Sequence, residues 1–111
     1  MKIDVLQSSG VAIVRPKGKV TIAGGDVALR SQVEQLVEAG ENKILVDLGS
    51  VAAMDSSGLG ELLACKAFCE SNGSTIKLLD ANRKITKVLT MTRLVGIFEI
   101  MDNEKAALSS F

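Results

Sequence analysis

The stretch Lys43-Ile44-Leu45-Val46-Asp47-Leu48 decides the fold, because it is a nearly continuous apolar run of strand length. Such a run is typical of a central strand that is covered on both faces. It leads through Val51-Ala52-Ala53-Met54 into the dense polar and glycine-rich turn Asp55-Ser56-Ser57-Gly58-Leu59-Gly60, where a helix is expected to begin. A buried strand and a helix thus flank an unusual turn, which becomes the first candidate for a functional surface.

The helix after this turn is predicted to run from Ser56 to Ser71, with Asn72-Gly73 closing it. Its apolar face is expected to carry Leu59, Leu62, Leu63 and Ala67. Cys65 and Cys69, the only cysteines, would then lie one helical turn apart, which suits burial better than disulfide geometry. Because the chain has no histidine, metal binding is not indicated. Two cysteines that suit burial better than a disulfide lead us to expect a reducing compartment.

Upstream of the central strand, two apolar patches around Ser8-Ser9-Gly10 predict a β-hairpin. Pro16, which lacks an amide donor, suggests an edge or a bulge. Gly24-Gly25-Asp26 then offers a turn with an acidic cap, and Gly40 lies where a left-handed C-terminal cap is expected. The intervening helix is predicted from the apolar positions Leu29, Val33, Leu36 and Val37.

Downstream, Thr75–Leu79 is predicted to form a strand. A short helix is expected at Ile85, Val88 and Leu89, a last strand at Ile97, Phe98 and Ile100, and a final helix through Leu108 that Asp102 caps. The order β, β, α, β, α, β, α, β, α requires parallel neighbours joined by right-handed crossovers. We therefore expect an α/β fold in one domain, residues 1–111.

The composition of the chain argues against nucleic-acid binding, secretion and membrane insertion. Thirteen basic and thirteen acidic residues leave a formal charge of zero, and three Phe are the only aromatic residues, so nucleic acid is not an expected partner. No apolar run is long enough for a signal peptide or a membrane span, which predicts a cytoplasmic protein without membrane insertion.

Enzymatic chemistry finds little support. A Ser-His-Asp hydrolase needs a histidine, and neither Ser56 nor Ser57 stands in a Gly-x-Ser-x-Gly elbow, although a serine-lysine pair stays open. Leu63 replaces the third glycine of a dinucleotide fingerprint, and Val20 replaces the hydroxyl residue of a phosphate loop. We expect no catalytic residue and no cofactor.

The turn itself allows two interpretations. Asp55 or Ser56 can simply cap the helix. Two adjacent hydroxyls followed by two glycines also favour a docking surface, since Gly58 would leave room for a partner and a serine at a helix start can carry phosphate.

The same residues resemble a known family. The run from Ile44 to Leu48, then Val51, then Met54 to Gly60 is similar to the motif of STAS domains, specifically the bacterial anti-sigma factor antagonists. Asn72-Gly73 and the segments near Val88, Leu94 to Phe98 and Glu104 to Leu108 also fit the family layout. The resemblance implies a mixed sheet of four to five strands flanked by about four helices.

It also implies a partner-switching cycle. The unphosphorylated antagonist binds an anti-sigma factor serine/threonine kinase and releases a sigma factor; the kinase, which brings the ATP, phosphorylates Ser56, and a phosphoserine phosphatase reverses this. The partner-binding residues expected from the motif and the loop beside it are Met54, Asp55, Ser56, Ser57, Gly58, Leu59, Thr21, Gly24 and Gly25.

One position departs from the family pattern. Members with this cycle often carry an acidic residue where this chain has Thr21, and Asp26 could substitute only if the loop folds back. The altered Gly24-Gly25 loop therefore keeps an alternative open, a non-phosphorylated STAS scaffold or transporter-associated subunit. A small hydrolase using Ser56 or Ser57, and a homodimer, also stay open.

Overall fold

The computed structural model describes residues 2–21, 26–79, 85, 87 and 97–111. A six-stranded sheet has the order β1-β2-β3-β5-β6, with β4 paired to β2 beside this path. The elements are β1 (Lys2–Ser8), β2 (Val11–Val20), α1 (Asp26–Glu38), β3 (Lys43–Asp47), β4 (Val51–Met54), α2 (Ser56–Ser71), β5 (Thr75–Leu79), β6 (Ile100–Met101) and α4 (Glu104–Ser109). The predicted α/β class is confirmed.

The first two strands form the expected hairpin, with antiparallel register from Lys2↔Lys17 to Ser8↔Val11. Ser9 and Gly10 form its turn with φ of 54° and 78°. Two consecutive positive φ angles match the right-handed twist of the flanking strands. Gly40 has φ of 100°, as expected for a glycine just past a helix end.

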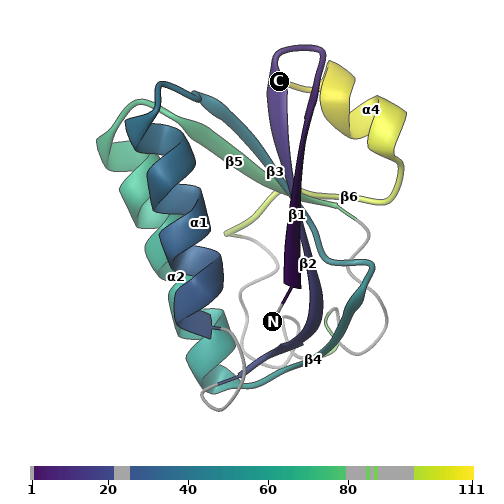
Figure 1. The fold of residues 1–111 in the computed structure, drawn as a ribbon. Coiled ribbons are helices and arrows are strands. Elements are labelled where there is room, and N and C mark those ends of the chain that lie inside the picture. Colours follow the sequence, from purple (N-terminus) through teal and green to yellow (C-terminus); the bar gives the residue numbers. More distant parts are fainter. Residues whose placement is uncertain (1, 22–25, 80–84, 86, 88–96) are drawn as a thin grey trace.

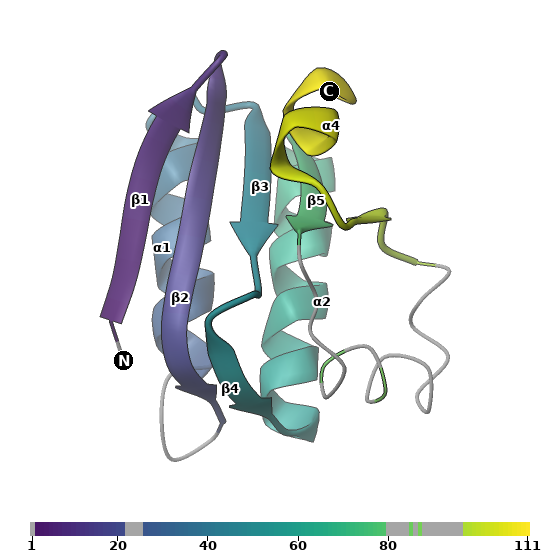
Figure 2. The same ribbon diagram turned by 90° about the vertical axis from the view of Figure 1, so that its right-hand side faces the viewer.

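The remaining strand pairs are parallel, and β3 lies in the middle of the sheet as predicted. Helices α1 and α2 cover one face, while α4 lies on the other (Figures 1 and 2). The main core fills the space beneath α1 and α2, and a smaller core that includes Ile13, Leu45 and Ala107 lies beneath α4.

Strand β4 was not expected from the sequence. Its four residues, Val51–Met54, include two alanines, which are depleted in strands, so the local pattern resembles a loop. The strand forms because β2 continues past the end of its pairing with β3 and offers Gly18–Val20 as a parallel partner. The sheet thus has more strands than the four to five expected.

Pro16 does not mark an edge strand, because β2 lies second in the sheet order. It falls between the residues of β2 that pair with β3 and those that pair with β4, and the register shifts between Gly18 and Lys19. The missing amide is tolerated where β2 changes partners.

The buried face of α2 differs from the prediction. Ala67 is exposed and Leu63 is only partly buried. The buried residues are Gly58, Leu59, Leu62, Cys65 and Cys69. Cys65 and Cys69 thus lie on the buried face of α2. Both thiols are fully buried, which confirms the prediction that the two cysteines pack in the core.

The C-terminal prediction also changes. The last strand is only Ile100–Met101, while Ile97 and Phe98 precede it in a turn and a bend. Asn103, not Asp102, caps α4, because its Oδ1 accepts from the Ala106 amide at 3.0 Å. In the part of the chain that the structure describes there are three multi-residue helices rather than about four.

Of the short helix expected at Ile85, Val88 and Leu89, Ile85 is helical and fully buried in the main core. Val88 and Leu89 lie outside the described residues.

Candidate functional site

The ends of two strands place the polar turn beside β2. Strands β2 and β4 are parallel with Val20 opposite Met54, so Thr21 and Asp55 follow at neighbouring strand ends. Helix α2 begins immediately after, at Ser56 (Figure 2). Carboxyl ends of parallel strands are a common place for binding residues in open α/β sheets.

Asp55 is the N-cap of α2. Its backbone is extended, with φ of −102° and ψ of −175°, and its Oδ1 accepts from the Gly58 amide at 2.9 Å. Its carbonyl accepts the first helical bond from the Leu59 amide at 3.0 Å. Of the two predicted caps, Asp55 and Ser56, the structure assigns Asp55, which leaves Ser56 as the exposed first residue of α2.

Gly58 serves packing within the chain rather than the approach of a partner. A Cβ added there would overlap the Val20 carbonyl oxygen and lie 2.8 Å from Met54 Cγ. The absence of a side chain therefore lets α2 start directly against the end of β2. Gly60 differs, because a Cβ there would meet nothing within 4 Å.

The other predicted binding residues divide by exposure. Met54 and Leu59 are 7% and 4% exposed and belong to the core, so they support the turn from beneath. Gly24 and Gly25 lie outside the described residues. The surface that a partner could contact, here named the Ser56 turn, consists of Thr21, Asp55, Ser56, Ser57 and Gly60.

Val27 adds an apolar group at the same end of the sheet. Helices α1 and α2 both begin near the ends of β2 and β4 (Figure 1), and Val27 in the first turn of α1 is 50% exposed. Sequence reasoning missed it, although its position outside the apolar stripe of α1 was a usable signal.

An ion pair joins α1 to α2 behind the Ser56 turn. Arg30 of α1 lies 3.0 Å from Glu61 of α2 through Nη1 and Oε2, and 3.3 Å from Glu34 through Nε and Oε1. The Arg30–Glu61 contact joins α1 to the first half of α2, whereas the Arg30–Glu34 contact lies within α1.

Nothing in the described geometry supports a nucleophile. None of the described lysines hydrogen-bonds to Ser56 or Ser57. Burial raises the pKa of Cys65 to about 12 and of Cys69 to about 11, which keeps both thiols protonated and unreactive.

Metal and membrane sites receive equally little support. Across residues 2–21, 26–79, 85, 87 and 97–111, no three potential ligands gather into a metal site. Within the same ranges, no helix is long and apolar enough to span a bilayer.

A family model described as "Mlab, STAS domain" matches residues 5–101. The chain belongs to the STAS domain family. This STAS domain is 30% identical over 110 residues to the anti-sigma F factor antagonist of Paenibacillus polymyxa, a match covering 98% of this chain and 93% of that protein.

Solved structures agree on the fold. The STAS domain superposes with a TM-score of 0.89 on a candidate anti-sigma factor antagonist of Thermotoga maritima, at 26% identity and over 97% of this chain and 92% of that one. It also matches the phosphorylated form of the Bacillus cell fate determinant SpoIIAA, with a TM-score of 0.74, 19% identity and 98% of each chain covered, which supports the fold alone.

Proposed function

We propose that this STAS domain is an anti-sigma factor antagonist that binds an anti-sigma factor through the Ser56 turn and is released by phosphorylation of Ser56. One observation carries the proposal. Ser56 is the exposed first residue of the 16-residue helix α2, directly after the Asp55 cap, so its hydroxyl is accessible without unfolding. The relatives' shared name, anti-sigma factor antagonist, supplies the class of partner.

Phosphorylation would act locally. A phosphate adds about −1.5 to −2 charges, which the amide-rich start of a helix tolerates. The added charge would stand next to the Asp55 carboxylate at the centre of the docking surface. A partner that packs closely on this surface would have to bury or oppose that charge, so its affinity would fall while the fold stays intact.

The partners follow from this cycle. The anti-sigma factor would itself be the serine/threonine kinase and bring the ATP, and a phosphoserine phosphatase would restore the unmodified state. The antagonist contributes a docking surface and an acceptor hydroxyl, and acts in the cytoplasm as a binding module rather than an enzyme.

Phosphate uptake tests the site. The wild-type chain, Ser56→Ala and Ser57→Ala are incubated with the cognate anti-sigma kinase and ATP, and intact masses are compared. We expect one phosphate on the wild type and on Ser57→Ala and none on Ser56→Ala. Equal uptake by the wild type and Ser56→Ala would refute the assignment of Ser56.

Thr21 supports a second candidate, a STAS scaffold that works without phosphorylation. It lies at the strand end beside Asp55. It is neutral where the family resemblance leads us to expect an acid in members with the phosphorylation cycle. A scaffold would bind its partner and take up no phosphate under the same assay. In that case Thr21→Glu tests whether the missing acid accounts for the difference.

A further inference from the structure

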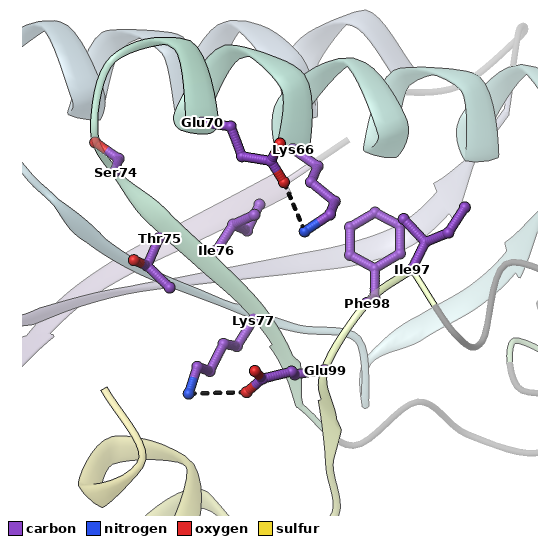
Figure 3. Close-up of a pocket in the computed structure, with 9 residues that line it drawn as sticks. All are labelled: Lys66, Glu70, Ser74, Thr75, Ile76, Lys77, Ile97, Phe98 and Glu99. Atoms are coloured by element: carbon purple, nitrogen blue, oxygen red, sulfur yellow. Dashed lines mark ion pairs between the residues drawn. The ribbon is translucent and has the colours of Figure 1, made fainter.

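The two edges of the sheet differ in how they are covered. At the β6 edge, residues 97–99 lie alongside β5: the Leu78 amide donates to Glu99 O at 2.9 Å, and Lys77 Nζ pairs with Glu99 Oε2 at 2.9 Å (Figure 3). Strand β1 forms the other edge, and among the described strands it pairs with β2 alone. It lies at the outer margin of the sheet with no helix beyond it (Figure 2). The outer side of β1 is therefore the accessible edge.

The hairpin turn determines which backbone groups of β1 face outward. In a hairpin closed by a two-residue turn, the residues that flank the turn, here Ser8 and Val11, exchange both of their backbone hydrogen bonds. Bonded and non-bonded pairs then alternate along the two strands. The N–H and C=O groups of Ile3, Val5 and Gln7 consequently point away from β2.

Pro16 supports this alternation independently. It lies opposite Ile3 in the hairpin, at a position where β2 needs no amide to donate to β1. Across the part of the chain that the structure describes, no hydrogen bond joins the outward groups of β1 to another residue. A row of unpaired backbone groups of this kind is a template for a further strand.

The second half of this edge is apolar and uncharged. Val5 and Leu6 are 36% and 45% exposed, and they point to opposite faces of the strand. Edge strands that stay unpaired usually carry charged side chains or proline, and β1 has neither from Val5 to Ser8. The edge is thus suited to pairing on its outer side.

We propose that β1 is the contact surface for a second copy of this chain, and that the two β1 strands pair antiparallel about a two-fold axis at Val5. Val5 then lies opposite Val5 of the second copy, and Ile3 lies opposite Gln7. Each of these outward pairs exchanges two backbone hydrogen bonds. The sheet becomes continuous across both copies, and the interface is self-complementary, as two-fold symmetry requires.

The neighbouring registers use the edge less well. An axis at Asp4 would place the two Asp4 carboxylates directly opposite each other, which is destabilising. An axis at Leu6 would place Ile3 opposite Ser9, which belongs to the hairpin turn, so this pair of outward groups would be lost. With the axis at Val5, every residue of β1 lies opposite a β1 residue of the second copy.

Charge also permits contact between two copies. The formal charge of the chain is zero, so the copies do not repel each other as a whole. The Asp4 carboxylate is paired within its own chain, where its Oδ2 lies 2.8 Å from Lys17 Nζ. Because the contact consists of one strand edge, it belongs to the small class of specific interfaces, and we expect a dissociation constant in the micromolar range.

This contact leaves the Ser56 turn free. Strand β4, which leads into the turn, pairs with β2 on the side away from β1 (Figure 2). A dimer would therefore present two copies of the Ser56 turn, and it would form whether or not Ser56 is phosphorylated.

Sedimentation velocity of the wild-type chain between about 1 and 500 μM measures the association, and we expect a reversible dimer in this range. Val5→Lys places two ammonium groups opposite each other at the axis and should raise the dissociation constant about ten-fold or more. Leu6→Lys is the matched control, because position 6 lies opposite Asp4 of the second copy. It should change the constant by no more than about three-fold.

Cysteine cross-linking tests the register directly. Residues directly opposite each other in an antiparallel pair have Cα atoms about 4.5–5.5 Å apart, within reach of a disulfide. Val5→Cys should therefore give a disulfide-linked dimer on mild oxidation. Leu6→Cys should not, since the two copies of position 6 lie on a diagonal of about 7–8 Å. The native Cys65 and Cys69 are buried, which keeps the background low.

Far-ultraviolet circular dichroism checks that each variant is folded. The proposal is overturned if the wild type stays monomeric at the highest concentration, if Val5→Lys and Leu6→Lys weaken the dimer equally, or if Leu6→Cys cross-links as readily as Val5→Cys. Ser56→Asp should dimerise like the wild type, so the outcome does not depend on the proposed phosphorylation.

Discussion

Single residues fix the geometry of the Ser56 turn. Because Gly58 has no side chain, α2 can start against the Val20 carbonyl, and the Asp55 carboxylate accepts a hydrogen bond from the Gly58 amide. Both residues therefore determine the position of the backbone at Gly58. Sequence reasoning found the turn and the need for a cap. It could not choose between Asp55 and Ser56, since both residue types cap helices, and it could not see that Gly58 faces β2, because that contact is between distant parts of the chain.

At position 58 we predict that Gly58→Ala lowers the free energy of unfolding by about 1–3 kcal/mol, the usual cost of forcing a methyl group into packed surroundings. Gly60→Ala is the matched control. Nothing lies within 4 Å of its added Cβ, so this change should be neutral or raise stability by up to about 1 kcal/mol through helix propensity. Urea unfolding measures both, and equal effects would contradict the role of Gly58.

Removing the cap should also be measurable. Asp55→Ala is expected to cost about 0.5–2 kcal/mol of stability, because the Gly58 amide loses its acceptor. Asp55→Asn keeps a capping oxygen and should retain most of that stability. If Asn were as damaging as Ala in thermal unfolding, capping would not be what Asp55 contributes.

Among the elements, α2 shows how periodicity can be misassigned. Leu63 and Ala67 fit one helical face as well as Cys65 and Cys69 fit the next, and only packing against the sheet decides which is buried. The thiols are buried, which links the stability of α2 to pH.

Stability should fall in alkaline solution. The folded-state pKa values of Cys65 and Cys69, about 12 and 11, lie above the ordinary value of 9.0. The contribution of the protonated thiols is thus complete below pH 9 and is lost as the pH rises through the folded values. Unfolding under reducing conditions between pH 8 and 10.5 should show a steeper decline for the wild type than for the Cys65→Ala/Cys69→Ala variant, and parallel curves would disprove this.

Helix α4 is held to the sheet by Arg15. Its Nε lies 2.7 Å from Asp47 Oδ2 on β3, and its Nη2 lies 2.8 Å from Glu104 Oε1 on α4. The two carboxylates differ in exposure, since the Asp47 side chain is 12% exposed and that of Glu104 is 47%.

This difference predicts unequal effects of substitution. Arg15→Ala should cost about 1–3 kcal/mol, because Asp47 is left with an unmatched, nearly buried charge. Glu104→Gln should cost at most about 1 kcal/mol, as for exposed ion pairs. Chemical denaturation of both variants provides the comparison, and a larger loss for Glu104→Gln would contradict it.

At the scale of the whole molecule, the alternation of strands and helices was predictable because β3 and β5 are continuous apolar runs and α1 has a clear stripe. The short strands β4 and β6 were not, since their pairing depends on where β2 and β5 end in space.

The resemblance on the motif residues led to the proposed docking surface, the Ser56 turn, and the fold places it at the ends of β2 and β4.

The central claim is that charge on Ser56 controls docking. The most direct measurement compares, by titration calorimetry, the affinity of the anti-sigma factor for the unmodified chain and for the chain carrying phosphoserine at position 56. We predict that the phosphate weakens binding at least about hundred-fold, the effect of leaving a buried charge uncompensated at an interface. Equal affinities for the two forms would contradict the account.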